Sequence, residues 1–144
     1  MKRLAAAALV AIVAVIPARA ADWPPADDYV NSLVNCSAST DAANCEYTRS
    51  VWAKQYGDAI TGDYQGQRNV SFCLSTGCNK AIIENHILGC AWRQVILKAG
   101  HLQIDQTDVS NLKHFCGDEL LDDAGRRAAN AQATRLLGML PQTR

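Results

Sequence analysis

The chain has 144 residues, with 14 Lys and Arg against 14 Asp and Glu, so its formal net charge is zero. Three of the basic residues lie within the first twenty positions, which leaves residues 21–144 with 11 positive against 14 negative charges, a net of −3. This balance excludes electrostatic attraction to nucleic acid or to an anionic membrane surface. The length of residues 21–144 suits a single domain.

The first twenty residues have the pattern of a secretory signal peptide. Lys2 and Arg3 precede an apolar run over residues 4–17, and the small residues Ala18 and Ala20 stand at the two positions that signal peptidase reads. The run is shorter than the roughly 20 residues that span a bilayer, and no later run could span one. We therefore expect cleavage near Ala20, a periplasmic or secreted mature protein, and no membrane insertion after cleavage.

Apolar residues recur at helical spacing through the rest of the chain, and no segment alternates as a strand would. Pro24 and Pro25 suit the first turn of a helix, where their missing N–H groups are not needed. The helix expected over residues 85–98 is apolar around most of its circumference, so we expect it to be packed between other helices. The pattern predicts an all-α fold of six helices in three antiparallel hairpins. The expected helices cover residues 24–36, 45–60, 64–74, 85–98, 107–116 and 118–140.

Residues 62–100 carry small, polar and apolar residues at the offsets of a known repeat. The matching positions are Gly62, Asp63, Gly66, Gln67, Val70, Ser71, Leu74 and Gly77 in a first helix, and Ile82, Asn85, Cys90, Ala91, Trp92 and Gly100 in a second. This segment resembles one Sel-one-like repeat, a relative of the tetratricopeptide repeat. The resemblance implies that small residues such as Gly66 and Ala91 let paired helices approach. It also implies three hairpins stacked as a short α-solenoid, and protein recognition as the usual role.

The six cysteines indicate disulfides, because an even number in an exported chain of this size is typical of a disulfide framework. Cys36 and Cys45 are equidistant from a turn near residue 40, and Cys90 and Cys116 from a turn near residue 103. Each pair should therefore lie across an antiparallel hairpin. The third preferred pair is the remaining one, which brackets a tight loop. The resemblance implies a rival pairing, because exported members of the family staple the two helices of one repeat. The preferred pairs are Cys36–Cys45, Cys73–Cys78 and Cys90–Cys116, and the rival is Cys73–Cys90.

The helices expected over residues 85–98 and 107–116 also suggest a metal site, as an alternative to a disulfide between them. His86 and Cys90 are four residues apart on one helix, and His114 and Cys116 lie on the opposing helix. Two imidazoles and two thiolates could hold zinc or copper. Exported cysteines usually oxidise, so we favour a disulfide between Cys90 and Cys116. We therefore expect no metal or other cofactor.

Catalytic patterns are weak. Glu84 and His86 are two apart, a spacing that on a helix points side chains in different directions. Asp118, Glu119, Asp122 and Asp123 stand at an expected helix start, where negative charge is favourable. No nucleophile elbow or phosphate loop is present. We therefore do not expect an enzyme.

The sequence then favours a protein that binds another protein, as an adaptor or inhibitor. Two alternatives are an immunity protein that neutralises a secreted toxin and a structural protein of the envelope. Trp52 and Trp92 hold core-like positions, so other aromatic and basic residues are the candidates for a partner surface. The candidate partner-binding residues are Trp23, Tyr64, Arg68, Arg93 and Lys98.

Overall fold

The computed structural model describes residues 22–141, so the predicted signal peptide lies outside the described residues. This part of the chain contains five α-helices, two short 3-10 helices and no strand beyond one isolated bridge, which confirms the all-α class. Within it, no helix combines the length and apolarity needed to cross a membrane. The α-helices are α1 (Ala42–Ile60), α2 (Tyr64–Thr76), α3 (His86–Lys98), α4 (Gln106–Phe115) and α5 (Asp123–Met139), and the 3-10 helices are η1 (Ala26–Tyr29) and η2 (Cys36–Ala38).

Each α-helix begins at an Asp or Asn whose side chain accepts a hydrogen bond from a backbone N–H of the first turn. These side chains satisfy donors that have no partner inside the helix. Between α1 and α2 the chain turns through Gly62 at φ 93°, and α2 ends at Gly77 with φ 69°, a backbone region open to glycine. Local sequence therefore sets most helix ends. The N-cap residues are Asp41, Asp63, Asn85, Asp105 and Asp122.

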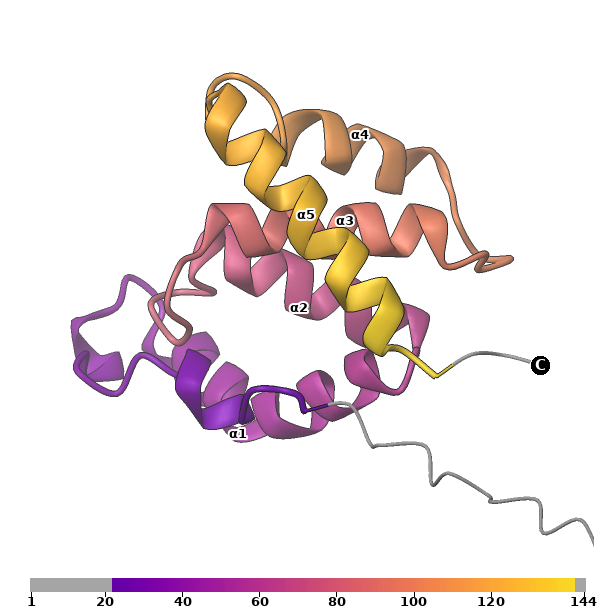
Figure 1. Ribbon diagram of the computed structural model, residues 1–144. Coiled ribbons are helices and arrows are strands. Elements are labelled where there is room, and N and C mark those ends of the chain that lie inside the picture. Colours follow the sequence, from indigo (N-terminus) through magenta and orange to yellow (C-terminus); the bar gives the residue numbers. More distant parts are fainter. Residues whose placement is uncertain (1–21, 142–144) are drawn as a thin grey trace, which may run out of the picture.

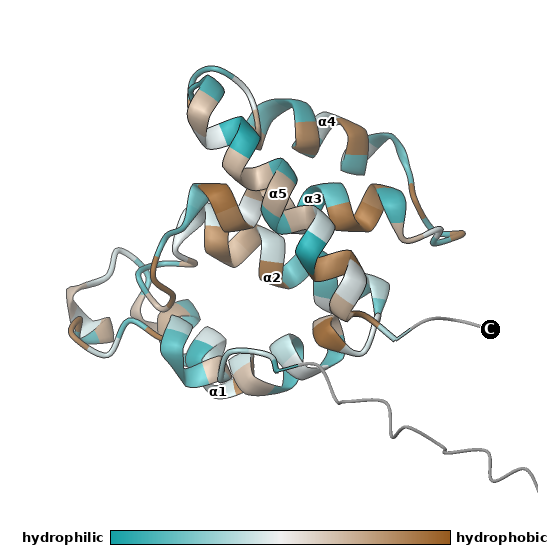
Figure 2. Cartoon of the chain, in the orientation of Figure 1, coloured by the Kyte–Doolittle hydropathy of each residue, from teal (hydrophilic) through white to brown (hydrophobic). Residues whose placement is uncertain are grey.

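Helix α3 is the centre of the fold. It packs against α2, α4 and α5, whereas α1 packs against the far side of α2 (Figure 1). In Figure 2, α3 carries several hydrophobic stretches and α1 is mostly pale or hydrophilic. Trp52 of α1 and Trp92 of α3 are both buried in the main core, as their sequence positions predicted.

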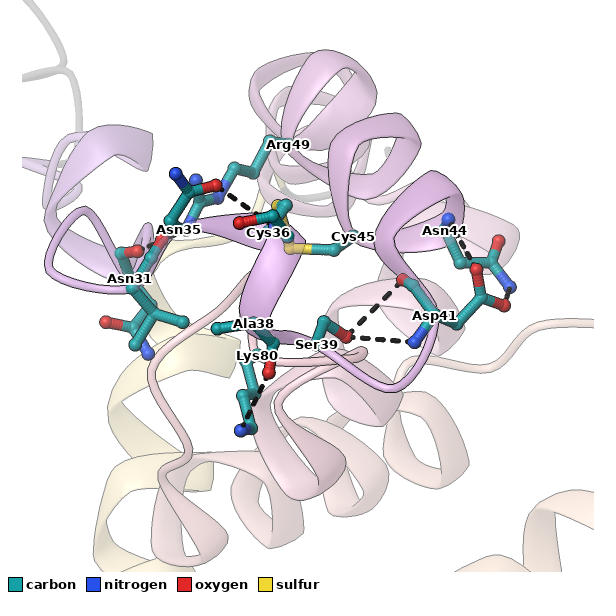
Figure 3. The surroundings of a disulfide bond; sticks show 12 residues. Asn31, Asn35, Cys36, Ala38, Ser39, Asp41, Asn44, Cys45, Arg49 and Lys80 are labelled. Atoms are coloured by element: carbon teal, nitrogen blue, oxygen red, sulfur yellow. Dashed lines mark hydrogen bonds between the residues drawn. A yellow bond between two sulfur atoms is a disulfide. The ribbon is translucent and has the colours of Figure 1, made fainter.

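The predicted helix over residues 24–36 is wrong. The structure has η1 there and, at Cys36, the first residue of η2; between them Val30 forms an antiparallel bridge with Ile82 and the chain then turns. Side chains of α1 hold this segment: Trp52 Nε1 donates to Ala26 O at 2.8 Å, and Arg49 Nη2 donates to the carbonyls of Asn31 and Val34 (Figure 3). The backbone of this segment pairs with residues 81–83: Asn31 N–H donates to Ala81 O at 2.9 Å, and Tyr29 O accepts from Ile83 N–H at 2.8 Å. These groups therefore bond across to another segment and not along a continuous helix.

The last two helices do not pair as the expected third hairpin. Helix α5 begins at Asp123, five residues later than predicted, and crosses over α3 (Figure 1). Its main packing is against α3, where Ala133 and Leu136 enter the core. The small Ala133 allows this close approach. Helices α2, α4 and α5 therefore gather around one central helix.

The structure contains the three preferred disulfides and leaves no free cysteine among the described residues. The rival pair, Cys73–Cys90, is not formed. Cys36 belongs to η2, so its bond to Cys45 joins a 3-10 turn to the first turn of α1, where two helices were expected (Figure 3). The Cα–Cα distances are 5.5 Å for Cys36–Cys45, 4.8 Å for Cys73–Cys78 and 5.2 Å for Cys90–Cys116.

Candidate functional site

Three of the five candidate partner-binding residues come together, and two lie elsewhere. Tyr64, Arg68 and Arg93 gather where α2, α3 and α4 meet. Trp23 lies near the start of the described chain, against α3, and Lys98 is exposed at the end of α3. Two separate sites follow from this arrangement, one around the arginines and one around Trp23.

Asp108 of α4 organises the first group. Its buried carboxylate accepts a hydrogen bond from Tyr64 Oη at 2.6 Å and pairs with Arg68 Nε at 3.2 Å. It also accepts from the backbone N–H of Asp105, which completes a capping box at the start of α4. Burial and the bond to Asp108 raise the pKa of Tyr64. The sequence analysis did not single out Asp108, although its position three residues after the N-cap Asp105 is a recognisable capping signal.

Arg93, one of the candidate partner-binding residues, is buried. Only 5% of the residue is exposed, and its guanidinium carbon lies 3.9 Å from the ring centre of Phe115. Burial lowers the pKa of Arg93 to about 10, while nearby Asp108 acts in the opposite direction. The side chain therefore carries its charge at neutral pH. It is covered because α4 packs on α3 and brings Phe115 over it, a tertiary contact that helix periodicity does not reveal.

A polar cleft opens beside these residues. Its volume is about 310 Å³, and its walls come from α2, α3 and α4. Two arginines and three side-chain amides supply hydrogen-bond donors. We call it the arginine cleft; it is lined by Gln65, Arg68, Asn69, Phe72, Arg93 and Asn111.

Trp23 takes part in a second cavity, formed between the N-terminal segment, α1, α3 and α5. Its ring stacks on Trp92 with centroids 5.8 Å apart and planes 19° apart. Trp23, a candidate partner-binding residue, is thus half-buried and packed. The cavity volume is about 270 Å³, and Gln132 and Arg135 add polar groups to it. We call this the aromatic cavity; its apolar and aromatic walls include Trp23, Tyr29, Tyr56, Leu88, Trp92 and Leu136.

Tyr56 lies at the inner side of the aromatic cavity. It is 4% exposed, and its ring centre lies 5.2 Å from that of Tyr29 and 6.1 Å from that of Trp52. Burial raises the pKa of the Tyr56 hydroxyl well above its ordinary value. The hydroxyl is therefore a neutral polar group in an otherwise apolar wall.

The alternative metal site is not assembled. Cys90 and Cys116 form a disulfide, so they offer no thiolates, and the His114 ring packs edge-on against Phe115. Among residues 22–141, no three His, Cys, Asp or Glu side chains converge as a metal site. The fourth candidate ligand, His86, lies beside Glu84.

The prediction that the side chains of Glu84 and His86 point in different directions is wrong. Glu84 Oε2 lies 3.7 Å from His86 Nε2. The two side chains meet because α3 begins at His86, so Glu84 stands in the preceding loop and helical geometry does not apply. Glu84 is well exposed, so this is a surface ion pair when His86 is protonated.

The structure thus defines a disulfide-stabilised, all-helical protein with one aromatic cavity and one arginine cleft in the described part of the chain. Comparisons with protein-family models, with curated proteins and with solved structures find no match.

Proposed function

We propose that this protein is exported and acts by binding another protein, without catalysis. Its six cysteines form three disulfides, which suits an oxidising compartment such as the periplasm or the cell exterior. The signal-like pattern of the first twenty residues supports the same location.

The observation that carries the proposal is the aromatic cavity. A volume of about 270 Å³ lies at the lower end of ligand pockets and suits one large side chain. Interface anchors are commonly aromatic side chains in desolvated pockets, surrounded by polar groups. The partner therefore inserts an apolar side chain against Trp23 and Trp92, and places an acidic group near the exposed Arg135.

The relation to Sel-one-like repeat proteins is part of this proposal. The α2–α3 hairpin spans the matching residues, with Asp63 as the N-cap of α2 and with Gly62 and Gly100 at φ 93° and 78° beyond the helix ends. The helix start at Asp63 and the turns at the two glycines support the resemblance. In that family the usual role is recognition of another protein, which agrees with a binding function.

Capture of a partner from an envelope extract tests the proposal. The mature wild-type protein should retain one stoichiometric partner, and Arg135→Glu should lose it, because the variant reverses the charge beside the cavity. Arg127→Glu is the matched control, since Arg127 is also an exposed arginine of α5 but does not line the cavity. Absence of any discrete partner would contradict the proposal and favour an envelope structural role.

The captured partner also decides between an adaptor and an immunity protein. A secreted toxin that loses its activity in the complex would identify immunity as the function. An envelope protein whose activity persists in the complex would identify an adaptor.

A further inference from the structure

The arginine cleft holds more positive charge than its own residues neutralise. Arg68 and Arg93 contribute two guanidinium groups, and Asp108 contributes one carboxylate beside them. Asp108 directly contacts Arg68, at 3.2 Å, and no hydrogen bond links it to Arg93. One buried positive charge therefore lacks a direct anionic partner.

The nitrogen atoms of Arg93 show where that charge is unsatisfied. Nε and Nη2 are both buried, and no acceptor among the described residues reaches either of them. A buried donor without an acceptor destabilises the folded protein, and more so when it is charged. Buried donors in native proteins are nearly always bonded to protein, water or an ion. The two unpartnered nitrogens thus point to a missing acceptor.

The positions of Arg93 Nε and Nη2 indicate which chemical class of acceptor fits them. Nε and Nη2 lie on the same edge of the guanidinium plane, where two parallel N–H groups match two oxygens of a carboxylate or phosphate. Phe115 covers the face of the group at 3.9 Å and leaves that edge unused. The amides of Asn69 and Asn111 line the same cleft and add neutral donors.

We propose that the arginine cleft binds a small oxyanion, a carboxylate or phosphate group, through the Nε/Nη2 edge of Arg93. Phe115 stacks on the guanidinium and holds its plane, while Arg68 stays bound to Asp108 and adds a second positive charge nearby. Both nitrogens are shielded from solvent in the free protein, so part of the cleft wall shifts when the anion enters. Phe72 lines the cleft, is 50% exposed and packs edge-on against Phe115, and we expect this side chain to move. This site is separate from the aromatic cavity and stands or falls independently of the proposed function.

Thermal unfolding with added anions tests the site. Sodium phosphate and sodium acetate are titrated separately, with sodium chloride at the same ionic strength as the reference. A ligand that binds only the folded protein raises its melting temperature. We expect a saturating rise in at least one of the two arms, and the arm that responds identifies phosphate or carboxylate. A melting temperature equal to that in chloride in both arms would overturn the proposal.

Two variants show whether Arg93 carries the effect. Arg93→Met keeps an unbranched side chain in the buried position but removes the fork, and should weaken anion binding at least about tenfold, the loss expected for charge-assisted hydrogen bonds. Lys113→Met, which removes an exposed cation of α4 that does not line the arginine cleft, should bind as the wild type does. An equal response of Arg93→Met and wild type would show that Arg93 has only a packing role.

A direct measurement on the wild-type protein covers the case in which Arg93→Met does not fold. The ¹⁵N resonance of Arg93 Nε should shift on titration with the anion that raises the melting temperature. An unchanged Arg93 resonance at saturating anion would contradict the proposed contact.

Discussion

Gly89 of α3 lies directly against Ser75 of α2. A Cβ added at Gly89 would stand 2.3 Å from Ser75 Oγ, and 3.2 Å from both Ser71 O and Ser75 N. Rotation of the Ser75 hydroxyl would relieve the first contact, but the other two involve backbone atoms. The contact between α2 and α3 therefore depends on the missing side chain at position 89.

We expect Gly89→Ala to destabilise the protein by about 1–3 kcal/mol, because the added methyl group overpacks this contact. Gly57→Ala is the matched control: Gly57 lies within α1, and its added Cβ would meet no atom within 4 Å. The control should gain about 0.5–1 kcal/mol from higher helix propensity. Urea unfolding of both variants checks the prediction, and a loss of similar size in both would contradict it.

Asp108→Asn should cost about 2–3 kcal/mol, because the buried carboxylate accepts a hydrogen bond from Tyr64 and forms an ion pair with Arg68. Asp118→Asn is the comparison, since Asp118 also pairs with an arginine but its side chain is 91% exposed. That change should cost less than about 1 kcal/mol. Chemical denaturation measures both, and equal costs would show that burial of Asp108 contributes nothing.

The three disulfides should contribute unequally. Cys90–Cys116 closes a loop of sequence separation 26 and Cys73–Cys78 one of 5. Restriction of the unfolded chain then gives about 3.5 kcal/mol for the longer loop and about 2 kcal/mol for the shorter. Paired Cys→Ala variants, compared by denaturant unfolding, test this order. A greater loss from removing Cys73–Cys78 would mean that native packing, and not loop closure, sets the contribution.

Tyr56 should make stability fall at alkaline pH. Burial raises the pKa of its hydroxyl in the folded protein, so the folded state keeps its proton where the unfolded chain loses it. The contribution is complete below about pH 10, the pKa of an unfolded tyrosine, and is lost as the pH rises further. Tyr56→Phe should therefore lose stability less steeply above about pH 10 than the wild type. Parallel pH curves of unfolding free energy would contradict this.

Local signals in the sequence predicted α1 to α4 with small errors at their ends. Asp63 and Asn85 cap helices, and Gly77 and Gly100 turn the chain beyond helix ends, and all four act through neighbouring residues alone. The pair Cys90–Cys116 also followed from local reasoning, because α3 and α4 are antiparallel neighbours joined by a short loop (Figure 1).

Features that depend on distant contacts were not predictable in the same way. Residues 24–36 have helical spacing, but the backbone of Tyr29 and Asn31 pairs with Ile83 and Ala81, about fifty residues away in the sequence. The Cys36–Cys45 bond forms even so, because residues nine apart can meet across a turn whatever the preceding structure. We predicted the Cys36–Cys45 pair from a hairpin of two helices. The structure contains the pair but not that hairpin.

In the two candidate sites, too, contacts within one helix followed from the sequence, and contacts between helices did not. Tyr64 and Arg68 are one helical turn apart, so their proximity follows from the sequence. Burial of Arg93 does not, because it requires Phe115 of α4 to lie over α3. Arg135 joins the aromatic cavity only because α5 crosses α3, so no pattern within residues 118–140 marks it as part of a site.

Site-specific photo-crosslinking in the intact envelope tests the binding function most directly. A photoreactive phenylalanine derivative at position 131 stands on the exposed surface of α5, one helical turn before Arg135, and leaves Arg135 and the cavity residues in place. The same group at position 127 lies on α5 farther from the cavity. The proposed function predicts an adduct with one protein from position 131 and none from position 127. No adduct from position 131, or the same adducts from both positions, would contradict it.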